Sequence, residues 1–365
     1  MTARQRPSAA QRWVLGVDSG GSGVRLALAR LDDDGQPRPP EFTHATNEPV
    51  RTGPAGIDAA HLLAQLVPAV RDFAEHGDVV AACVGATGMA SLGGDLRDRL
   101  PGALRAEFGV HRLALAADAV TAYAGALGMR AGSVVAAGTG LIALGTGLDR
   151  SGWRRADGWG QLLGDCGGGA WIGRAGLEAA LRAYDGRAGG SAALLARLEA
   201  VFGPAPTLPG LLYPRSDRPA LLASFAPEVA RCAQNDPVAA GILRTAARHI
   251  LESAAAVRPG PESAEVALTG GLFNIGEPLL GPLREQSPQL LPEARLLMAE
   301  CDPLHGALRI AAALSYGDLP LPADGALLTT NEAHRSPERA ANRCEPRQTG
   351  PTGSGISPDP PGKAR

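Results

Sequence analysis

Two units of strand, glycine-rich turn and strand constrain the fold of this chain more than any other feature of its sequence. Short apolar runs at residues 13–17 and 24–31 flank the first turn, and similar runs at 133–137 and 141–147 flank the second. Apolar runs on both sides of a short glycine turn are typical of neighbouring antiparallel strands. The approximate repeat predicts two similar halves that face each other across a cleft.

The rest of the chain predicts helices in alternation with strands. Apolar residues at helical spacing predict helices at 57–75, 96–108, 119–127, 173–184, 191–202, 221–232, 238–257 and 303–315. Short apolar runs predict further strands at 79–85, 111–116 and 265–268, whereas residues 37–54 predict a loop. We therefore expect an α/β fold with a mixed sheet flanked by helices in each half.

The length of 365 residues, with 45% hydrophobic residues, is sufficient for two lobes with cores of their own. We expect a first lobe over residues 1–122 and a second over 123–319, with the last helix, 303–315, packing back on the first lobe. From residue 320 to 365, Pro, Gly, Ser, Thr and Arg predominate. We expect this tail to be disordered.

Lys363 is the only lysine of the chain, so almost every basic residue is arginine. The expected core therefore lacks the lysine that a Walker A loop, a protein-kinase strand or a pyridoxal Schiff base requires. Phosphate binding must then rely on backbone amides, hydroxyl groups and a metal ion.

Charge and cysteine content favour a cytoplasmic protein with a small-molecule partner. The 35 basic and 37 acidic residues give a net charge of -2 without long blocks of one sign, which does not indicate binding to nucleic acid or an anionic membrane. No apolar run reaches membrane-spanning length, and residues 1–12 are polar, with no signal-peptide segment behind them. The five cysteines contain no Cys-x-x-Cys pair, which fits neither a disulfide framework nor a zinc or iron–sulfur site.

The first turn, Asp18-Ser19-Gly20-Gly21-Ser22, has the composition of a phosphate-binding loop. Glycine lets backbone N–H groups approach a phosphate closely, and serine adds donors without bulk. Asp18 is compatible with a phosphate only if Mg²⁺ lies between them. A dinucleotide-binding fingerprint would open a helix, whereas the next residues predict a strand. A plain glycine-rich hairpin is the other alternative.

Asp118 stands where a predicted strand ends and a helix of small residues begins. Aspartate is a preferred N-cap, so a structural role is the simpler interpretation of this residue alone. The functional interpretation is that its carboxylate accepts a proton from a substrate hydroxyl that attacks phosphorus. Its place at the mouth of the expected cleft favours the functional interpretation.

The second turn, Gly138-Thr139-Gly140, repeats the chemistry of the first from the other half of the chain. A phosphate clamp needs donors from both sides of a cleft, and this turn supplies them. Gly270 and Gly271 end a later strand, where a nucleoside can lie against exposed backbone.

The loop 157–169 has the composition of a sugar-binding element. Trp159 lies between Gly158 and Gly160, and Asp165 follows within the same loop. A flat indole ring suits the apolar face of a pyranose, and a carboxylate accepts hydrogen bonds from its hydroxyls. Packing of the tryptophan on a turn is the alternative.

Taken in this order, the motifs resemble those of the N-acetylglucosamine kinases and the wider BadF/BadG/BcrA/BcrD ATPase family, within the superfamily of sugar kinases, actin and heat-shock chaperones. The resemblance implies two actin-like (RNase H-like) lobes that close around ATP, Mg²⁺ and a sugar, and it implies a homodimer. It runs from residue 13 to 315. The motifs that carry it are Gly16-Val17-Asp18-Ser19-Gly20-Gly21-Ser22, Ala117-Asp118-Ala119, Ala137-Gly138-Thr139-Gly140, Gly158-Trp159-Gly160 with Gly164-Asp165, and Leu268-Thr269-Gly270-Gly271.

The resemblance also implies roles for individual residues. Asp118 would be the base that activates the 6-hydroxyl of N-acetylglucosamine or a related amino sugar, and Asp18 would hold Mg²⁺ through water. The phosphate contacts would come from Ser19, Gly20, Gly21, Ser22, Gly138, Thr139 and Gly140. The sugar pocket would be lined by Asn47, Gly158, Trp159, Gly160 and Asp165, and the adenosine would be bordered by Gly270 and Gly271.

Three places depart from the family pattern. Leu141 and Ile142 follow the second turn where the family has serine and, in the sugar kinases, asparagine; Cys166 replaces an acid after Asp165; and Asn235 replaces a glycine. These changes leave the identity of the sugar open and keep two alternatives, an ATPase that acts on a protein partner and a non-catalytic sensor of ATP or sugar. The zinc-binding cysteine cluster of another bacterial sugar-kinase family is absent, so we expect no structural metal.

Overall fold

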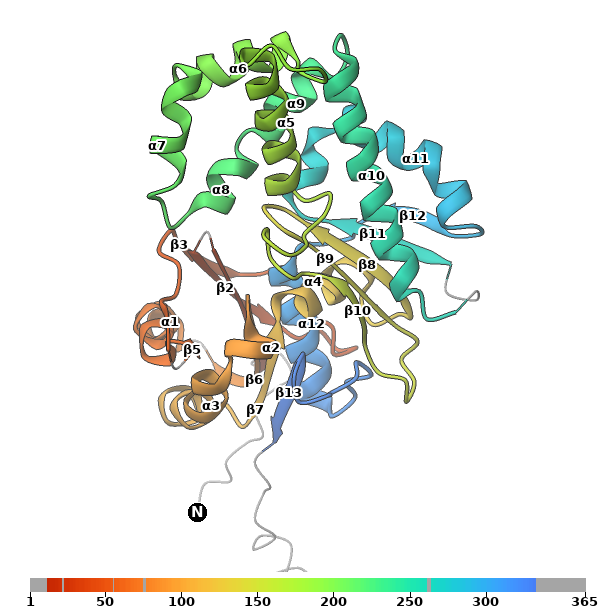
Figure 1. The fold of residues 1–365 in the computed structure, drawn as a ribbon. Coiled ribbons are helices and arrows are strands. Elements are labelled where there is room, and N and C mark those ends of the chain that lie inside the picture. The colour runs from red at the N-terminus through yellow and green to blue at the C-terminus, as the bar shows by residue number, and fades with distance from the viewer. Residues whose placement is uncertain (1–11, 22, 55, 75–76, 261–263, 333–365) are drawn as a thin grey trace, which may run out of the picture. The chain divides into compact units, whose positions relative to one another are not determined.

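Two mixed β-sheets form the centre of the computed structural model, which describes residues 12–332 except 22, 55, 75–76 and 261–263. Ser22 of the first turn and most of the expected tail, residues 333–365, lie outside the described residues. Helices flank both sheets (Figure 1), so the predicted α/β fold with two mixed sheets is confirmed.

The first sheet has the strand order β13-β7-β6-β1-β2-β3. Its strands are β1 (Arg12–Gly20), β2 (Gly23–Arg30), β3 (Phe42–Thr46), β6 (Asp78–Ala86), β7 (Arg112–Ala117) and β13 (Leu328–Glu332). Strands β1 and β2 form the first predicted hairpin, β3 is antiparallel to β2, and β6 and β7 run parallel to β1. A short pair, β4 (Thr52–Gly53) and β5 (Gly56–Ile57), stands apart from this sheet.

The second sheet has the strand order β10-β9-β8-β11-β12. Its strands are β8 (Gly132–Ala137), β9 (Leu141–Thr146), β10 (Arg154–Asp157), β11 (Glu265–Thr269) and β12 (Arg295–Met298). Strands β8 and β9 form the second predicted hairpin, β10 is antiparallel to β9, and β11 and β12 run parallel to β8. The order and the directions of these five strands match those of β3-β2-β1-β6-β7 in the first sheet. The predicted repeat therefore exists at the level of topology.

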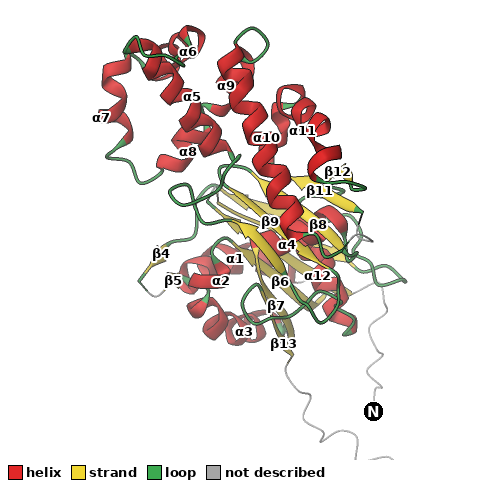
Figure 2. Cartoon of the chain, turned by 45° about the vertical axis from the view of Figure 1, so that its right-hand side comes forward, coloured by secondary structure: helices red, strands yellow, loops and turns green. Residues whose placement is uncertain are grey.

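The helices differ in number between the two sheets (Figure 2). Those packed on the first sheet or beside it are α1 (Ala59–Ala74), α2 (Met89–Leu92), α3 (Gly94–Phe108), α4 (Asp118–Leu127) and α12 (Pro303–Tyr316). Those that accompany the second are α5 (Gly169–Tyr184), α6 (Ala192–Phe202), α7 (Leu208–Leu212), α8 (Arg218–Ala223), α9 (Ala226–Cys232), α10 (Pro237–Val257) and α11 (Glu277–Leu290). Short 3₁₀ turns occupy Ala205–Thr207 and Gly271–Ile275.

Helices α4 and α12 approach each other backbone to backbone. A Cβ atom added at Gly306 of α12 would lie 1.9 Å from the carbonyl oxygen of Thr121, and one added at Gly125 of α4 would lie 2.2 Å from the carbonyl oxygen of Asp302. Helix α4 contacts strands of both sheets, and α12 packs on β1 and β6. Glycine at these positions is therefore required for the helix pair that joins the two sheets.

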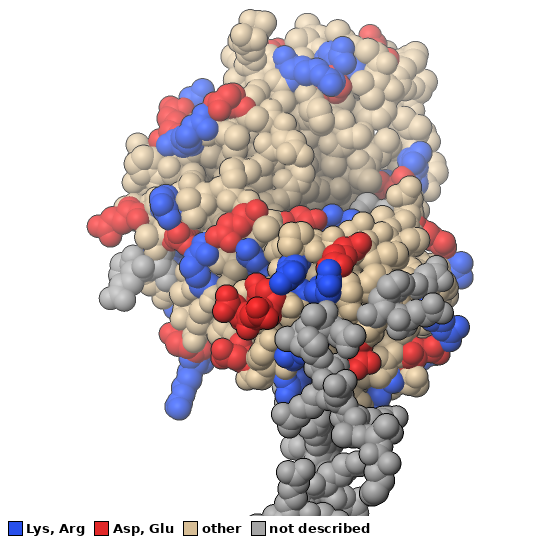
Figure 3. All heavy atoms as spheres, turned by 180° about the vertical axis from the view of Figure 1, so that it is seen from behind, with Lys and Arg blue, Asp and Glu red and all other residues tan. Residues whose placement is uncertain are grey.

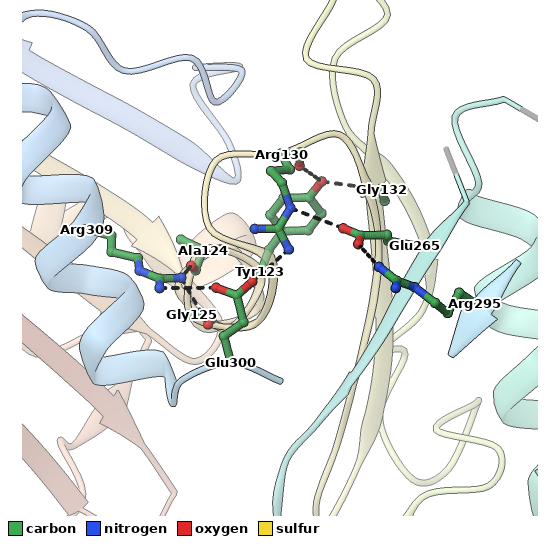
Figure 4. A network of polar contacts seen from close by, with 9 residues as sticks. All are labelled: Tyr123, Ala124, Gly125, Arg130, Gly132, Glu265, Arg295, Glu300 and Arg309. Carbon is green, nitrogen blue, oxygen red and sulfur yellow. Dashed lines mark hydrogen bonds and ion pairs between the residues drawn. The ribbon is translucent and has the colours of Figure 1, made fainter. Parts of the chain in front are cut away.

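A network of charged side chains surrounds this helix pair (Figure 4). Arg130, which follows α4, donates from Nε to Glu265 of β11 at 3.1 Å and from Nη2 to Glu300 at 2.7 Å. Arg309 of α12 donates to Glu300 at 3.2 Å and to the carbonyl oxygen of Ala124 at 3.1 Å. Hydrogen bonds from the arginines hold the pKa values of both glutamates below their usual range, so the network is fully charged at neutral pH.

Three regions differ from the sequence prediction. Strand β3 lies within the predicted loop 37–54, and β13 lies within the segment that was expected to be disordered, so that expectation is wrong for residues 328–332. Both are edge strands, and β3 has mostly exposed side chains, so neither shows the strong apolar pattern of a central strand. The helix predicted at 221–232 is divided into α8 and α9, because Pro227 occupies the first turn of α9 and cannot continue a preceding helix.

Arginine and acidic side chains are interspersed over the surface seen from behind (Figure 3).

Within the described part of the chain, none of the helices combines the length and the apolar character needed to cross a membrane.

Candidate active site

Asp118 is the first residue of α4, directly after β7. Thr87, which follows β6, donates from Oγ1 to Asp118 Oδ2 at 2.6 Å, and the N–H of Ala119 donates to Asp118 Oδ1 at 2.8 Å. The N-cap residue of α4 is Ala117, and no side chain caps this helix. Asp118 therefore does not occupy the N-cap position, but its carboxylate does bind an N–H group of the first turn, so a structural contribution to the start of α4 stays open beside the functional one. Thr87, which the sequence analysis missed, orients this carboxylate.

Asp18, near the end of β1, is paired with an arginine. Arg25 of β2 lies opposite Asp18 in the hairpin and donates from Nη2 to Asp18 Oδ2 at 2.6 Å. The same guanidinium donates from Nη1 to Asp302 Oδ2 at 2.9 Å, while Asp302 Oδ1 caps α12 by accepting from the N–H of His305. An arginine inside an otherwise apolar strand was the available sequence signal for this pair. The signal for Asp302 was an aspartate before Pro303.

Burial raises the pKa of the Asp18 carboxyl, and the nearby carboxylates of Asp118 and Asp302 raise it further, whereas the hydrogen bond and charge of Arg25 oppose these effects. Because folding raises this pKa, ionised Asp18 lowers stability at neutral pH, and the cost disappears as the pH falls from the folded-state pKa to the unfolded value. A cation close to these carboxylates would favour the ionised form.

The carboxylates of this region fit a Mg²⁺ ion that is held mainly by phosphate oxygens and water. Asp18 and Asp118 interact electrostatically, and Asp18 is largely buried. Among the described residues, no group of three or more His, Cys, Asp or Glu side chains forms a cage that could hold a metal ion by itself. Mg²⁺ retains several waters and usually takes one or two carboxylates together with substrate phosphates, which agrees with this arrangement.

The first turn places open backbone beside Asp118. The N–H of Thr87 donates to the carbonyl oxygen of Ser19 at 2.9 Å, and a Cβ atom at Gly20 would lie 3.6 Å from Thr87 Oγ1. No heavy atom lies within 4 Å of the position of a Cβ atom at Gly21, so a ligand can approach the backbone there. Asn47 is exposed and lies at the end of β3, next to this turn.

The second turn is fixed by the start of α5. The N–H groups of Gly169 and Ala170 each donate at 2.8 Å to the carbonyl oxygens of Gly138 and Thr139, respectively, and Thr139 is exposed. Gly270, at φ 102°, approaches Ala137 so closely that an added Cβ atom would lie 2.2 Å from its carbonyl oxygen. The structure thus brings the glycines after β11 next to the second turn.

Asp157, which the sequence analysis did not select, closes the loop that carries Asp165. Its Oδ1 accepts from the N–H of Asp165 at 2.5 Å, and its Oδ2 accepts from the N–H of Cys166 at 2.9 Å. Asp165 Oδ1 accepts from the N–H of Gly160 at 3.0 Å, and a Cβ atom added at Gly140 would lie 2.3 Å from Asp165 Oδ2. Asp165 therefore joins the predicted sugar loop to the second turn.

Trp159 presents its ring outward, with 66% of the residue exposed. The guanidinium of Arg155 lies 4.6 Å from the ring centroid and donates to the carbonyl oxygen of Gly158 at 2.8 Å. Ile142 contacts Gly158, where an added Cβ atom would lie 2.8 Å from its side chain. A Cβ atom added at Gly164 would lie 3.2 Å from Cδ1 of Trp159, so the ring also contacts its own loop, as the packing alternative requires, and that alternative stays open. Ile142 lies at the base of this loop.

The residues of the candidate site that the structure describes form two groups, and no hydrogen bond or ion pair joins one group to the other. The first sheet and α12 carry Asp18, Ser19, Gly20, Gly21, Arg25, Asn47, Thr87, Asp118 and Asp302. The second sheet and its loops carry Gly138, Thr139, Gly140, Gly158, Trp159, Gly160, Asp165, Gly270 and Gly271. Each group offers exposed backbone and carboxylates, which is the chemistry needed to hold a nucleotide and a polyol.

Comparison with known proteins gives one family and a set of related structures. A family model described as the BadF/BadG/BcrA/BcrD ATPase family matches residues 15–311. A structure of a proposed N-acetylglucosamine kinase from Chromobacterium violaceum is 27% identical, covers 82% of this chain and 99% of its own, and has a TM-score of 0.57.

Two further structures are similar in fold. A proposed N-acetylglucosamine kinase from Porphyromonas gingivalis is 17% identical, with a TM-score of 0.60 and coverage of 82% of this chain and 98% of its own. The ROK hexokinase from Thermus thermophilus is 18% identical, with a TM-score of 0.51 and coverage of 83% and 98%. No curated protein sequence matches this chain.

Proposed function

Starting from the premise that this chain belongs to the BadF/BadG/BcrA/BcrD ATPase family, we propose that it transfers the γ-phosphate of ATP to the 6-hydroxyl of a sugar, N-acetylglucosamine or a related amino sugar. The observation that carries the proposal is the carboxylate of Asp118, which is oriented by Thr87 beside the first glycine turn. The similarity to the Chromobacterium violaceum protein supports the choice of acceptor.

Asp118 is the proton acceptor of the proposed reaction. The sugar hydroxyl oxygen forms a bond to the γ-phosphorus, the bond from phosphorus to the bridging oxygen of ADP breaks, and the hydroxyl proton passes to an Asp118 oxygen. The hydrogen bond from Thr87 occupies Oδ2, and the N–H of Ala119 restrains Oδ1. The carboxylate is therefore positioned before the sugar arrives, which lowers the entropic cost of reaching the transition state.

The two glycine turns bind the nucleotide phosphates in this proposal. Backbone N–H groups of Gly20 and Gly21 face the phosphates together with the hydroxyl of Thr139. The N–H of Gly138 donates within its turn to the carbonyl oxygen of Gly140 at 3.0 Å, so Gly138 contributes the absence of a side chain. Gly270 and Gly271 border the adenosine. Asp18 would be the residue that helps to hold Mg²⁺, and the metal would supply neutralisation of the charge on the phosphates.

The acceptor is held by the loop that follows β10. Asp165 accepts hydrogen bonds from sugar hydroxyls, Trp159 covers an apolar face of the ring, and Gly158, Gly160 and Asn47 border the pocket. Leu141 and Ile142 replace polar residues at the base of this loop, so we expect discrimination among acceptors to rely on Asp165 more than in relatives that have serine and asparagine there.

A sugar-dependent ADP-release screen with MgATP tests the proposal and its alternatives together. We expect one amino sugar to raise the rate of ADP release well above the rate without sugar. Release of ADP that no sugar changes would favour an ATPase with a protein partner. Sugar binding in a calorimeter without any turnover would favour a sensor.

Replacing Gly140 by alanine should raise the KM for the sugar about tenfold or more while leaving the fold intact. The added methyl group would lie 2.3 Å from Asp165 Oδ2, so the carboxylate must leave its position. Steady-state kinetics in both substrates are the measurement. A KM for the sugar equal to that of the wild type would contradict the assigned position of Asp165.

In the pH profile of kcat/KM for MgATP, the apparent pKa of the acid limb should lie above the ordinary value of an aspartate. The reason is that the reaction requires ionised Asp18, whose pKa is raised by burial. Arg25→Gln removes a group that lowers this pKa, so the limb should move to higher pH. Asp302→Asn removes a carboxylate that raises it, so the limb should move to lower pH. Shifts in the same direction for both variants would remove Asp18 from this role.

A further inference from the structure

A cavity of about 370 Å³ lies beside the sugar loop and is separate from the residues assigned above to ATP and sugar. Its walls come from residues 161–166 of the loop, from α5, and from the segment that joins α7 to α8. Figure 2 shows the short helix α8 beside the lower end of α5 and the short helix α7 farther from α5. The volume is within the range of small-molecule sites in proteins.

Two arginines without a carboxylate partner line this cavity. Arg174 of α5 and Arg218 of α8 are both exposed, and within the described part of the chain neither makes an ion pair or a hydrogen bond through its side chain. No aspartate or glutamate lines the cavity. Asp217 is the nearest acid in sequence to Arg218, and Arg215 already binds it in a two-point ion pair at 2.6 and 2.7 Å. Both charged side chains that line the cavity are therefore positive, whereas the carboxylates of Asp157, Asp165 and Glu252 act on Cys166 from behind its wall.

Most of the remaining lining side chains are apolar, and three of them are largely exposed. Leu162 and Leu163 are 88% and 84% exposed, and Tyr213 is 71% exposed. Trp171 of α5 forms the opposite wall, and an edge contact with His249, at 5.2 Å between ring centroids, fixes its ring. Two adjacent exposed leucines in the same cavity as two unpaired arginines present a surface for a ligand that is both apolar and anionic.

We propose that this cavity binds an organic anion with an apolar body. The anionic group lies between Arg174 and Arg218, and the body covers Leu162 and Leu163 and contacts Trp171. Arginine supplies paired donors in a fork that suits a carboxylate or a phosphate, which are the two anionic groups that fit.

Occupation of the cavity acts on the acceptor site through the backbone. Gly164 and Cys166 line the cavity, and Asp165 between them directs its side chain to Gly140. A ligand that orders this stretch changes the KM for the sugar more than kcat, because it restrains Asp165 and does not contact Asp118. This consequence rests on the proposed kinase activity, whereas binding itself does not.

The test uses 8-anilinonaphthalene-1-sulfonate, a fluorescent aryl anion, with the full chain. We expect saturable binding that weakens about tenfold or more in Arg174→Gln/Arg218→Gln and also in Leu162→Ser/Leu163→Ser. The matched control is Arg105→Gln, an exposed arginine of α3, which should bind the probe like the wild type. Octanoate and octyl phosphate should displace the probe, and their relative potency separates a carboxylate from a phosphate. Octan-1-ol, which lacks the charge, should not displace it.

Three results overturn the proposal. If probe affinity is unchanged in both double variants, the cavity is not the binding site. If octan-1-ol displaces the probe as well as octanoate does, binding does not require an anionic group. A dimer in light scattering that becomes a monomer in Leu162→Ser/Leu163→Ser identifies a second copy of the chain as the occupant. If no sugar is phosphorylated, the kinase proposal fails while the probe titration still decides the site. If a sugar is phosphorylated, octanoate should change its KM in the wild type and not in the arginine double variant.

Discussion

Asp118→Asn should lower kcat for sugar phosphorylation by about 10²- to 10⁴-fold while leaving MgATP affinity nearly unchanged. An amide has the shape of a carboxylate; its oxygen can accept from the N–H of Ala119 while its NH2 group donates to the hydroxyl of Thr87, so the local geometry should persist. What is lost is the ability to accept the proton of the attacking hydroxyl. Rapid-quench or steady-state kinetics, with nucleotide affinity measured separately by calorimetry, resolve the two effects.

Two further variants make this result specific. Thr87→Val removes the hydrogen bond that orients Asp118 and should give a smaller loss, because the base remains but is less restrained. Asp149→Asn, which changes a carboxylate that binds Ser151 in the turn between β9 and β10, should leave kcat unchanged. Wild-type activity in Asp118→Asn would remove this residue from the mechanism.

Gly306→Ala should destabilise the protein by about 3 kcal/mol and lower Tm by at least about 5 °C. The added methyl group would lie 1.9 Å from the carbonyl oxygen of Thr121 and 2.5 Å from the backbone nitrogen of Gly125. Backbone atoms cannot move aside as the end of a side chain can, so α4 and α12 must separate. Their separation would also stretch the bonds from Arg309 to the carbonyl oxygens of Ala124 and Gly125 (Figure 4).

The matched control is Gly241→Ala in α10. Both are glycines within helices, but at Gly241 a Cβ atom would have no heavy atom within 4 Å apart from its chain neighbours and the backbone of its own helix. Alanine is the better helix former, so this variant should be stabilised by about 0.5–1 kcal/mol. Thermal unfolding of both variants is the measurement. Equal stability of Gly306→Ala and the wild type would show that the two helices are not in the contact described.

The elements of the fold that could be predicted are those whose signals are local. Glycines between two apolar runs predicted both hairpins, and the small residues after Asp118 predicted α4. The repeat was predictable as a pattern, whereas its strand-for-strand match also required β3 and β10, which lie at sheet edges and lack a strong apolar pattern.

The residues of the candidate site that escaped prediction depend on contacts between distant parts of the chain. Arg25 and Asp302 are separated by 277 residues and meet only because α12 returns to β1. The absence of lysine from the core suggested phosphate binding without a basic side chain, whereas Arg25 places one beside Asp18. Asp157 was missed because its role is to bind backbone N–H groups within its own loop, and residue spacing does not reveal such contacts.

The most direct test of the central proposal is the product itself. The amino sugar that raises ADP release most strongly should be incubated with MgATP and the reaction followed by ³¹P NMR. We expect a new phosphomonoester signal coupled to the C6 protons of the sugar, in a one-to-one ratio with ADP, and no such signal with Asp118→Asn. A reaction that yields only ADP and inorganic phosphate, with every sugar recovered unchanged, would contradict the assignment of this chain as a sugar kinase.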